Sequence, residues 1–205
     1  MRRRHRITTG LAAALLLFTP GPAAADSSAR VDQDQVRHQA LGQVDDEYLR
    51  AAEPAARAVA GEFGIPASVT AGQSILESAW GSSRLAVNDR NYFGFKCTAS
   101  GPGPMAVGCH DYPTTECGLD PAHPDACTQV QALFRVYDSM TASFRDYGRL
   151  MTTSDYYAAA LPLAHDPDAF ATEVAKHYAT DPDYAAKVIR VMRDHDLYRL
   201  DRPLP

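Results

Sequence analysis

The sequence predicts an α+β fold in which a mainly helical body carries a small β lobe. Apolar residues recur at three- and four-residue spacing through residues 69–80, as they do on the buried face of a helix. All four cysteines fall between residues 97 and 127, in a stretch rich in Gly, Pro, Thr and Asp. A short alternating segment at residues 130–137 then has the pattern of a strand. We therefore expect the helices to supply the core and the cysteine-rich stretch to form a separate, disulfide-bonded lobe.

Residues 1–25 have the pattern of a signal peptide. Four arginines precede a short apolar run, and three alanines at 23–25 offer a small-residue cleavage site. The apolar run is well short of the ~20 residues that a membrane-spanning helix needs. We therefore expect a secreted or cell-wall protein without a membrane span. Residues 26–45 are expected to form a mobile N-terminal tail with room for one short helix, and residues 46–205 a single domain.

The charge of the chain argues against one class of partner. The 205 residues hold 20 Lys and Arg against 25 Asp and Glu, a net charge of −5. Loss of residues 1–25 removes four arginines and leaves a net charge of −9. Such an acidic chain is a poor binder of nucleic acid. It must also recognise any anionic polymer by local contacts in a groove, because long-range attraction is missing.

The first two helices of the domain are predicted from composition and periodicity. An alanine-rich run over residues 46–63 is expected to be helical up to Gly64. Pro54 lies inside this run and is expected to kink or divide the helix, because proline lacks a backbone donor. The next helix is expected to have Pro66 in its first turn and to carry an apolar face through residues 69–80. It is expected to end at Trp80-Gly81, with glycine as its C-terminal cap.

Three later helices are predicted from their capping residues. Asp138 or Ser139 is placed to cap a helix that runs to Met151. Asp166-Pro167 and Asp181-Pro182 each combine an N-cap aspartate with a proline at the first helical position. We therefore expect two further helices to begin at these two Asp-Pro pairs.

The four cysteines are expected to form two disulfide bonds. An even number of cysteines in an exported chain favours disulfides. A zinc site is disfavoured, because the stretch has no Cys-x-x-Cys pair and its histidines sit at no recognised zinc spacing. We expect neither a metal nor a cofactor. Three pairings are possible, and the two short sequential loops favour Cys97–Cys109 with Cys117–Cys127.

Glu77 is the main candidate for chemistry. On a helix, Gln73, Glu77 and Trp80 lie three or four residues apart and share a stripe beside the apolar face. A surface glutamate at the helix edge accounts for this spacing equally well. The alternative is a glutamic acid that apolar neighbours keep protonated near neutral pH, ready to act as a general acid. Spacing alone does not choose between them.

Four sequence motifs choose the second interpretation. In chain order they are GQSILESAWGSS at 72–83, NYFGFK at 91–96, FRVYDS at 134–139 and YATDPDYA at 178–185. This series resembles the family-73 glycoside hydrolases, the bacterial autolysin and flagellar-rod glucosaminidases that cut the glycan of peptidoglycan. The resemblance implies a lysozyme-like fold whose small lobe flanks a glycan groove. It also implies hydrolysis of the β-1,4 bond after N-acetylglucosamine.

The resemblance further implies roles for individual residues. Glu77 is the expected general acid, which protonates the leaving oxygen. For the second catalytic role the chain offers Glu116, which matches a T-x-E motif of the family, and Tyr178 of the YATDP motif. The 2-acetamido group of the substrate is a third choice, and core packing is the alternative role of Tyr178. Five residues are expected to bind the substrate: Gln73, Trp80, Asn91, Tyr92 and Phe93.

Two other functions remain open at this level. An N-acetylmuramidase or lytic transglycosylase also uses a glutamate on a helix, but it cuts the other bond of the glycan. A catalytically inactive glycan-binding module is the alternative outside the enzymes, and the complete LES-x-WG motif argues against it. In each case the expected partner is the glycan strand of peptidoglycan, and we expect a monomer.

Overall fold

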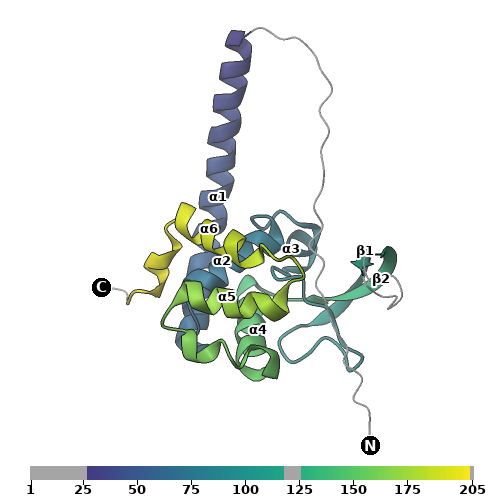
Figure 1. Cartoon of the computed structure of the whole chain (residues 1–205). Helices are drawn as coiled ribbons and strands as arrows, with labels where there is room; N and C mark the ends of the chain where they lie inside the picture. The colour runs from purple at the N-terminus through teal and green to yellow at the C-terminus, as the bar shows by residue number, and fades with distance from the viewer. Residues whose placement is uncertain (1–26, 118–125, 204–205) are drawn as a thin grey trace, which may run out of the picture.

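The computed structural model describes residues 27–117 and 126–203 of the chain, and for residues 27–42 and 44 the backbone alone. The predicted signal peptide lies outside this part. Within it, a mainly helical body carries a two-stranded lobe on one side (Figure 1), which confirms the predicted fold class. The elements are α1 (Ser27–Phe63), α2 (Ala67–Ser78), α3 (Arg84–Asp89), β1 (Gly108–Cys117), β2 (Cys127–Val136), α4 (Met140–Thr153), α5 (Pro167–Tyr178), α6 (Tyr184–Asp194) and the 3₁₀ helix η3 (Leu197–Asp201).

Helix α2 is the central element of the body. It packs against α1, α4, α5, α6 and η3. Of its twelve residues, all but Leu76 and Glu77 are buried. Its small residues permit this close approach: a Cβ on Gly72 would lie 3.1 Å from Met192 Cγ of α6. A helix surrounded on most sides holds its few polar side chains in fixed positions, which matters for Glu77.

Helix α1 is longer than the sequence predicts. It begins at Ser27, so the segment expected to be a tail is helical in the structure and extends away from the body (Figure 1). Its mobility stays a prediction. The helix also continues through Pro54 without being divided. Burial of Ala52, Ala55 and Val59 on either side of the proline offsets the missing backbone hydrogen bond.

Two of the three predicted caps are confirmed. Ser139 Oγ accepts a hydrogen bond from the Ala142 N–H at 3.1 Å, and Asp166 Oδ1 accepts one from Ala169 at 3.1 Å. The prediction for Asp181 is wrong, because α6 begins only after Asp183. Asp181 Oδ1 instead accepts from the Asp183 N–H at 2.9 Å. The Asp-Pro pair therefore makes a turn ahead of α6, a common use of aspartate.

The lobe is an antiparallel hairpin with two disulfide bonds. The register runs from Gly108 opposite Val136 to Cys117 opposite Cys127. Both predicted pairings are confirmed, since Cys97 is bonded to Cys109 and Cys117 to Cys127. The first bond ties the preceding loop to β1, and the second joins directly opposed strand positions. The predicted strand at 130–137 is present and begins three residues earlier.

A buried ionic cluster joins the lobe to the body. Arg135 of β2 donates to Asp146 Oδ2 of α4 at 2.5 Å, and the Tyr137 hydroxyl donates to the same oxygen at 2.8 Å. Arg149 Nε donates to Asp146 Oδ1 at 2.9 Å. Asp146 is fully buried, so these three donors supply the interactions that its carboxylate would otherwise make with water.

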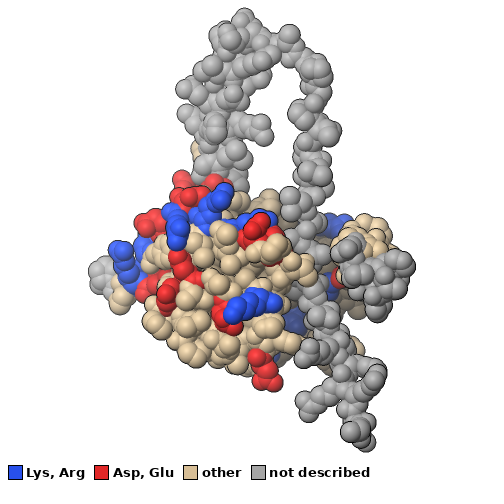
Figure 2. All heavy atoms as spheres, in the orientation of Figure 1, with Lys and Arg blue, Asp and Glu red and all other residues tan. Residues whose placement is uncertain are grey.

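The described surface is mixed in charge on the face shown in Figure 2. Acidic and basic side chains lie intermixed, mainly over the upper left of that view, and ion pairs join Arg193 to Asp168 and Lys187 to Asp181. No helix of the described chain is both long enough and apolar enough to cross a membrane.

Candidate active site

Glu77 lies on the last turn of α2 and keeps part of its side chain accessible. Burial raises the pKa of its carboxyl from 4.5 to about 7, and a hydrogen bond from Tyr184 opposes part of that rise. A carboxyl with this pKa is protonated in a large fraction of molecules near neutral pH. The structure thus favours the general-acid interpretation of Glu77 over the ordinary surface glutamate.

Tyr184, the first residue of α6, makes the direct contact with Glu77. Its hydroxyl donates a hydrogen bond to Glu77 Oε1 at 2.7 Å. The same hydroxyl accepts a hydrogen bond from Gln73 Nε2 at 2.9 Å. On its other side Gln73 Oε1 accepts a hydrogen bond from the Tyr147 hydroxyl of α4. Three helices therefore meet at one line of hydrogen bonds that ends on the Glu77 carboxyl.

Sequence reasoning missed Tyr184. It belongs to the YATDPDYA motif, but the first tyrosine of that motif, Tyr178, was taken as the candidate. The sequence held only part of the signal: Tyr184 begins the apolar face of α6, which places its ring in the core. That this face packs on α2, the helix that bears Glu77, comes from the structure. A tyrosine on such a face can bring its hydroxyl to a neighbouring carboxyl while its ring fills the core.

Tyr178 lies behind this contact. It is 2% exposed, and its ring stacks on that of Tyr184 with 5.6 Å between centroids. Among the described residues its hydroxyl has no hydrogen-bond partner. Burial, and secondarily the charge of Glu77, raise the pKa of Tyr178 well above its usual value. Tyr178 is therefore a neutral phenol packed against the residue that binds Glu77.

Glu116 sits on the lobe rather than beside Glu77. It lies on β1 opposite Thr128, and its carboxylate forms an ion pair with Lys96. Within the described chain no hydrogen bond or ion pair joins Glu116 to Glu77. The two candidate carboxyl groups thus belong to separate parts of the molecule, one in the packed body and one on the disulfide-bonded hairpin.

Three of the five predicted substrate-binding side chains are buried. Gln73 is 1% exposed and uses both ends of its amide inside the protein. Asn91, 1% exposed, donates to the carbonyls of Phe95 and Arg135. Phe93 is fully buried and stacks on Tyr147 at 4.5 Å. In this conformation these three side chains support the site and do not line its surface.

Trp80 and Tyr92 keep part of their surfaces accessible. Trp80 contacts the ring of Tyr48 edge-on, with 6.1 Å between centroids, and that of His195 at 4.6 Å. Tyr92 contacts Tyr48 at 6.0 Å. Aromatic rings that are packed on one side and open on the other are suited to stack on sugars.

The backbone that follows α2 determines where the side chain of Trp80 lies. The helix ends at Ser78, two residues earlier than predicted, and Ala79, Trp80 and Gly81 all have positive φ angles, of 49°, 58° and 71°. Left-handed backbone costs about 1 kcal/mol or more for each non-glycine residue. Gly81 is required, since a Cβ there would lie 2.8 Å from the Tyr48 ring. This strained turn directs the indole of Trp80 next to the Glu77 helix end.

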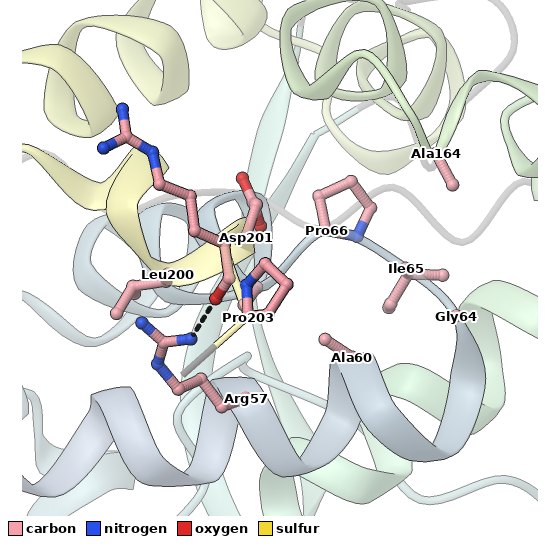
Figure 3. Close-up of a pocket in the computed structure, with 11 residues that line it drawn as sticks. Arg57, Ala60, Gly64, Ile65, Pro66, Ala164, Leu200, Asp201 and Pro203 are labelled. Atoms are coloured by element: carbon pink, nitrogen blue, oxygen red, sulfur yellow. Dashed lines mark hydrogen bonds between the residues drawn. The ribbon is translucent and has the colours of Figure 1, made fainter. Parts of the chain in front are cut away.

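A hollow of about 500 Å³ lies at the opposite end of α2 (Figure 3). Ala67, which begins α2, is part of its lining, and Glu77 is ten residues further on, or roughly 15 Å along the helix. Two of its charged side chains are engaged in the fold: Arg57 donates to the carbonyls of Arg202 and Arg199, and Asp201 accepts from the Ser68 N–H. We therefore place the candidate active site at Glu77 and not in this hollow.

Metal binding has no evident place in the described chain. Within residues 27–117 and 126–203 there is no group of three or more His, Cys, Asp or Glu side chains arranged to hold a metal ion. The chemistry that the site offers is proton transfer by a carboxyl of raised pKa next to accessible aromatic rings.

A carboxyl of raised pKa at the end of a buried helix, in a helical body that carries a small β lobe, is typical of lysozyme-like glycoside hydrolases. The comparison with known sequences gives the family. Residues 53–197 match the glucosaminidase family, described as mannosyl-glycoprotein endo-beta-N-acetylglucosaminidase, and the chain belongs to this family. The resemblance inferred from the four motifs is thereby confirmed.

Curated relatives are bacterial. The peptidoglycan hydrolase FlgJ of Pseudomonas aeruginosa is 32% identical over 159 residues, which is 75% of this chain and 38% of that protein. The exo-glucosaminidase LytG of Bacillus subtilis is 30% identical over 143 residues, 67% of this chain and 47% of that one. The chain thus spans less than half the length of these two relatives.

Solved structures show the same fold. The C-terminally truncated glycoside hydrolase domain of Salmonella typhimurium FlgJ is 30% identical with a TM-score of 0.58, covering 74% of this chain and 97% of that one. The catalytic domain of the autolysin Auto from Listeria monocytogenes superposes with a TM-score of 0.66 over 82% of this chain and 97% of that one. At 23% identity, Auto is evidence for the fold alone.

Proposed function

We propose that the protein is a secreted peptidoglycan hydrolase that cleaves the β-1,4 bond after N-acetylglucosamine, with Glu77 as general acid. The observation that carries the proposal is the carboxyl of Glu77, whose pKa is raised to about 7 at the end of a buried helix. Membership of the glucosaminidase family supports the sugar specificity. The peptidoglycan hydrolases among its relatives support the polymer.

Glu77 acts by giving its proton to the oxygen that leaves the anomeric carbon. Once the proton is gone, a buried carboxylate is left that water solvates poorly. The hydrogen bond from the Tyr184 hydroxyl stabilises this charge. Burial therefore makes the acid available near neutral pH, and Tyr184 keeps its conjugate base from becoming too unstable.

For the second catalytic role we favour the 2-acetamido group of the substrate. Its carbonyl can attack the anomeric carbon and replace a protein nucleophile or base. Glu116 is the competing candidate, and its ion pair with Lys96 holds it on the lobe. Tyr178 is less suited to touch substrate, because its hydroxyl is buried behind Tyr184. Trp80 and Tyr92 are proposed to stack on the sugar rings.

Export of the chain is supported by two features. Residues 1–25 have the composition of a signal peptide. The two disulfide bonds of the lobe are typical of proteins that fold outside the reducing cytoplasm. Mass determination of the protein recovered from culture medium would show whether the N-terminal segment has been removed.

The proposed activity is tested with purified peptidoglycan and mass spectrometry of the released fragments. New reducing ends on N-acetylglucosamine are expected, and reducing or anhydro ends on N-acetylmuramic acid would identify a muramidase or transglycosylase instead. Glu77→Gln should lower the rate at least ~100-fold, because it keeps the shape but cannot supply a proton. Glu62→Gln on the surface of α1 is the matched control and should leave the rate unchanged. Near-normal activity of Glu77→Gln would refute the role of Glu77.

A further inference from the structure

The hydrogen bonds that reach Glu77 from the interior have a defined direction. The Tyr147 hydroxyl donates to Gln73 Oε1. Gln73 Nε2 donates to the Tyr184 hydroxyl, which in turn donates to Glu77 Oε1. Gln73 and Tyr147 are 1% and 0% exposed, so water does not replace either of them. The direction is therefore set by protein groups alone.

This direction decides where the acid proton of Glu77 is held. Glu77 Oε1 accepts the proton of the Tyr184 hydroxyl, so the carboxyl must carry its own proton on Oε2. In the reverse direction Oε1 would carry the proton and donate it to Tyr184. The proton would then point into the helical body, away from any substrate.

Gln73 has the chemistry needed to select one direction. A hydroxyl rotates and can donate or accept, whereas a primary amide has one end that only donates and one that only accepts. Because the acceptor end of Gln73 is engaged by Tyr147, its donor end faces Tyr184. Tyr184 then already accepts one hydrogen bond, and its proton is left for Glu77.

We propose that Gln73 and Tyr147 are positioning residues that orient the Tyr184 hydroxyl and keep the acid proton of Glu77 on Oε2. The inference rests on the proposed role of Glu77 as general acid. It gives a function to a buried glutamine whose side chain cannot reach a glycan from its place inside α2.

The test is the pH dependence of kcat on a soluble glycan fragment of peptidoglycan, measured for Gln73→Met and Tyr147→Phe. Either change allows Glu77 to be protonated on Oε1 and to donate to Tyr184. That unproductive form lowers the plateau of kcat, which is its constant value at low pH where Glu77 is protonated. It also shifts the basic limb of the profile, where kcat falls as Glu77 ionises, to higher pH. If the new hydrogen bond has ordinary strength, the plateau falls about five-fold and the basic limb moves up by roughly 0.7 pH unit, with KM unchanged.

A control separates this role from packing. Met151→Leu changes a buried residue on the same helix as Tyr147, α4, without touching the hydrogen bonds. It should leave both plateau and limb in place. Tyr147→Phe removes a single oxygen and decides the question by itself if Gln73→Met does not fold, as judged by circular dichroism.

The outcomes are distinct. A folded Tyr147→Phe enzyme with the wild-type plateau and limb would overturn the inference, and so would a lowered plateau with an unmoved limb. If Glu77→Gln is inactive while both positioning variants behave as wild type, the inference fails and the proposed function stands. If Glu77→Gln remains active, the proposed function itself fails.

Discussion

The helical body and the β lobe are held together by different means. The body buries a continuous apolar cluster drawn from α1, α2, α4, α5 and α6. The lobe has two strands, and its buried aromatic residues Tyr112 and Phe134 lie outside that cluster. The Cys97–Cys109 bond, the Asp146 junction and backbone hydrogen bonds between residues 89–97 and residues 133–137 fix its position. The Cys117–Cys127 bond closes the hairpin itself. The proposed acid Glu77 thus stands on a helix packed into the main core, whereas Glu116 stands on a hairpin with little core of its own.

This difference bears on mechanism. Proton transfer requires groups placed to within a fraction of an ångström, and rigid elements provide that better than small lobes. We therefore propose that the body carries the chemistry and that the lobe aligns the substrate. Four predictions follow from this division, from the largest expected effect to the smallest.

Asp146→Ala should have the largest effect, because it leaves the buried Arg135 without its partner. Loss of one member of a buried ion pair typically costs about 3–5 kcal/mol. Urea unfolding would measure the change in the free energy of unfolding. Asp155→Ala, an exposed aspartate, is the control and should stay within about 0.5 kcal/mol of wild type. An Asp146 variant as stable as this control would mean that the junction is not needed to hold the lobe.

Reduction of the disulfides should loosen the lobe and leave the body folded. Each bond closes a short loop and is expected to stabilise the folded state by about 3 kcal/mol, because it lowers the entropy of the unfolded chain. All four cysteines lie within or next to the lobe, so the far-UV circular dichroism of the helices should persist after reduction. Loss of most of that helical signal would show that body and lobe fold as one unit.

Glu77→Gln should make stability less dependent on pH. The folded-state pKa of Glu77 is about 7, above the usual 4.5. Below pH 4.5 the carboxyl is neutral in both states and the substitution should change little. As the pH rises from 4.5 to 7, the carboxyl ionises in the unfolded state before it ionises in the folded state. The wild type therefore loses up to about 3 kcal/mol of stability over this range, and the loss is complete above pH 7. The variant should therefore be more stable than wild type at pH 8 and equal at pH 4. Thermal unfolding that differs equally at both pH values would contradict the raised pKa.

Glu116→Gln should have the smallest effect on turnover. If the acetamido group of the substrate acts as nucleophile, loss of the ion pair with Lys96 disturbs alignment and lowers kcat/KM by about five-fold. The rate of glycan cleavage measured beside Glu77→Gln decides the point. If Glu116→Gln proves as inactive as Glu77→Gln, Glu116 is the general base of an inverting mechanism, and the lobe carries chemistry after all.

Features that depend on local sequence were predictable. The caps at Ser139 and Asp166 follow from residues within three positions, and the disulfide pairing follows from two short loops. The importance of Glu77 followed from the motifs and not from its spacing, because a glutamate at the helix edge and a buried acid can occupy the same position relative to the apolar residues. Its raised pKa arises from helices that are distant in the sequence.

Features that depend on how distant helices dock were not predictable. Tyr184 reaches Glu77, 107 residues away, only because α6 packs on α2. Gln73 lies on the same stripe as Glu77, yet it faces α4 and α6 and is buried. Helix α1 continues through Pro54 for the same reason, because its packing against the rest of the body outweighs the tendency of proline to interrupt a helix.

The bond between Cys117 and Cys127 has a consequence for how freely the chain can vary. It joins positions that are directly opposed in the hairpin, so the covalent link fixes which residues of β1 and β2 face each other. A slip of one residue would turn Phe134 outward and Leu133 inward, and the bond forbids it. Substitutions along β1 and β2 can therefore weaken or strengthen the contacts between the strands without changing which residues are paired.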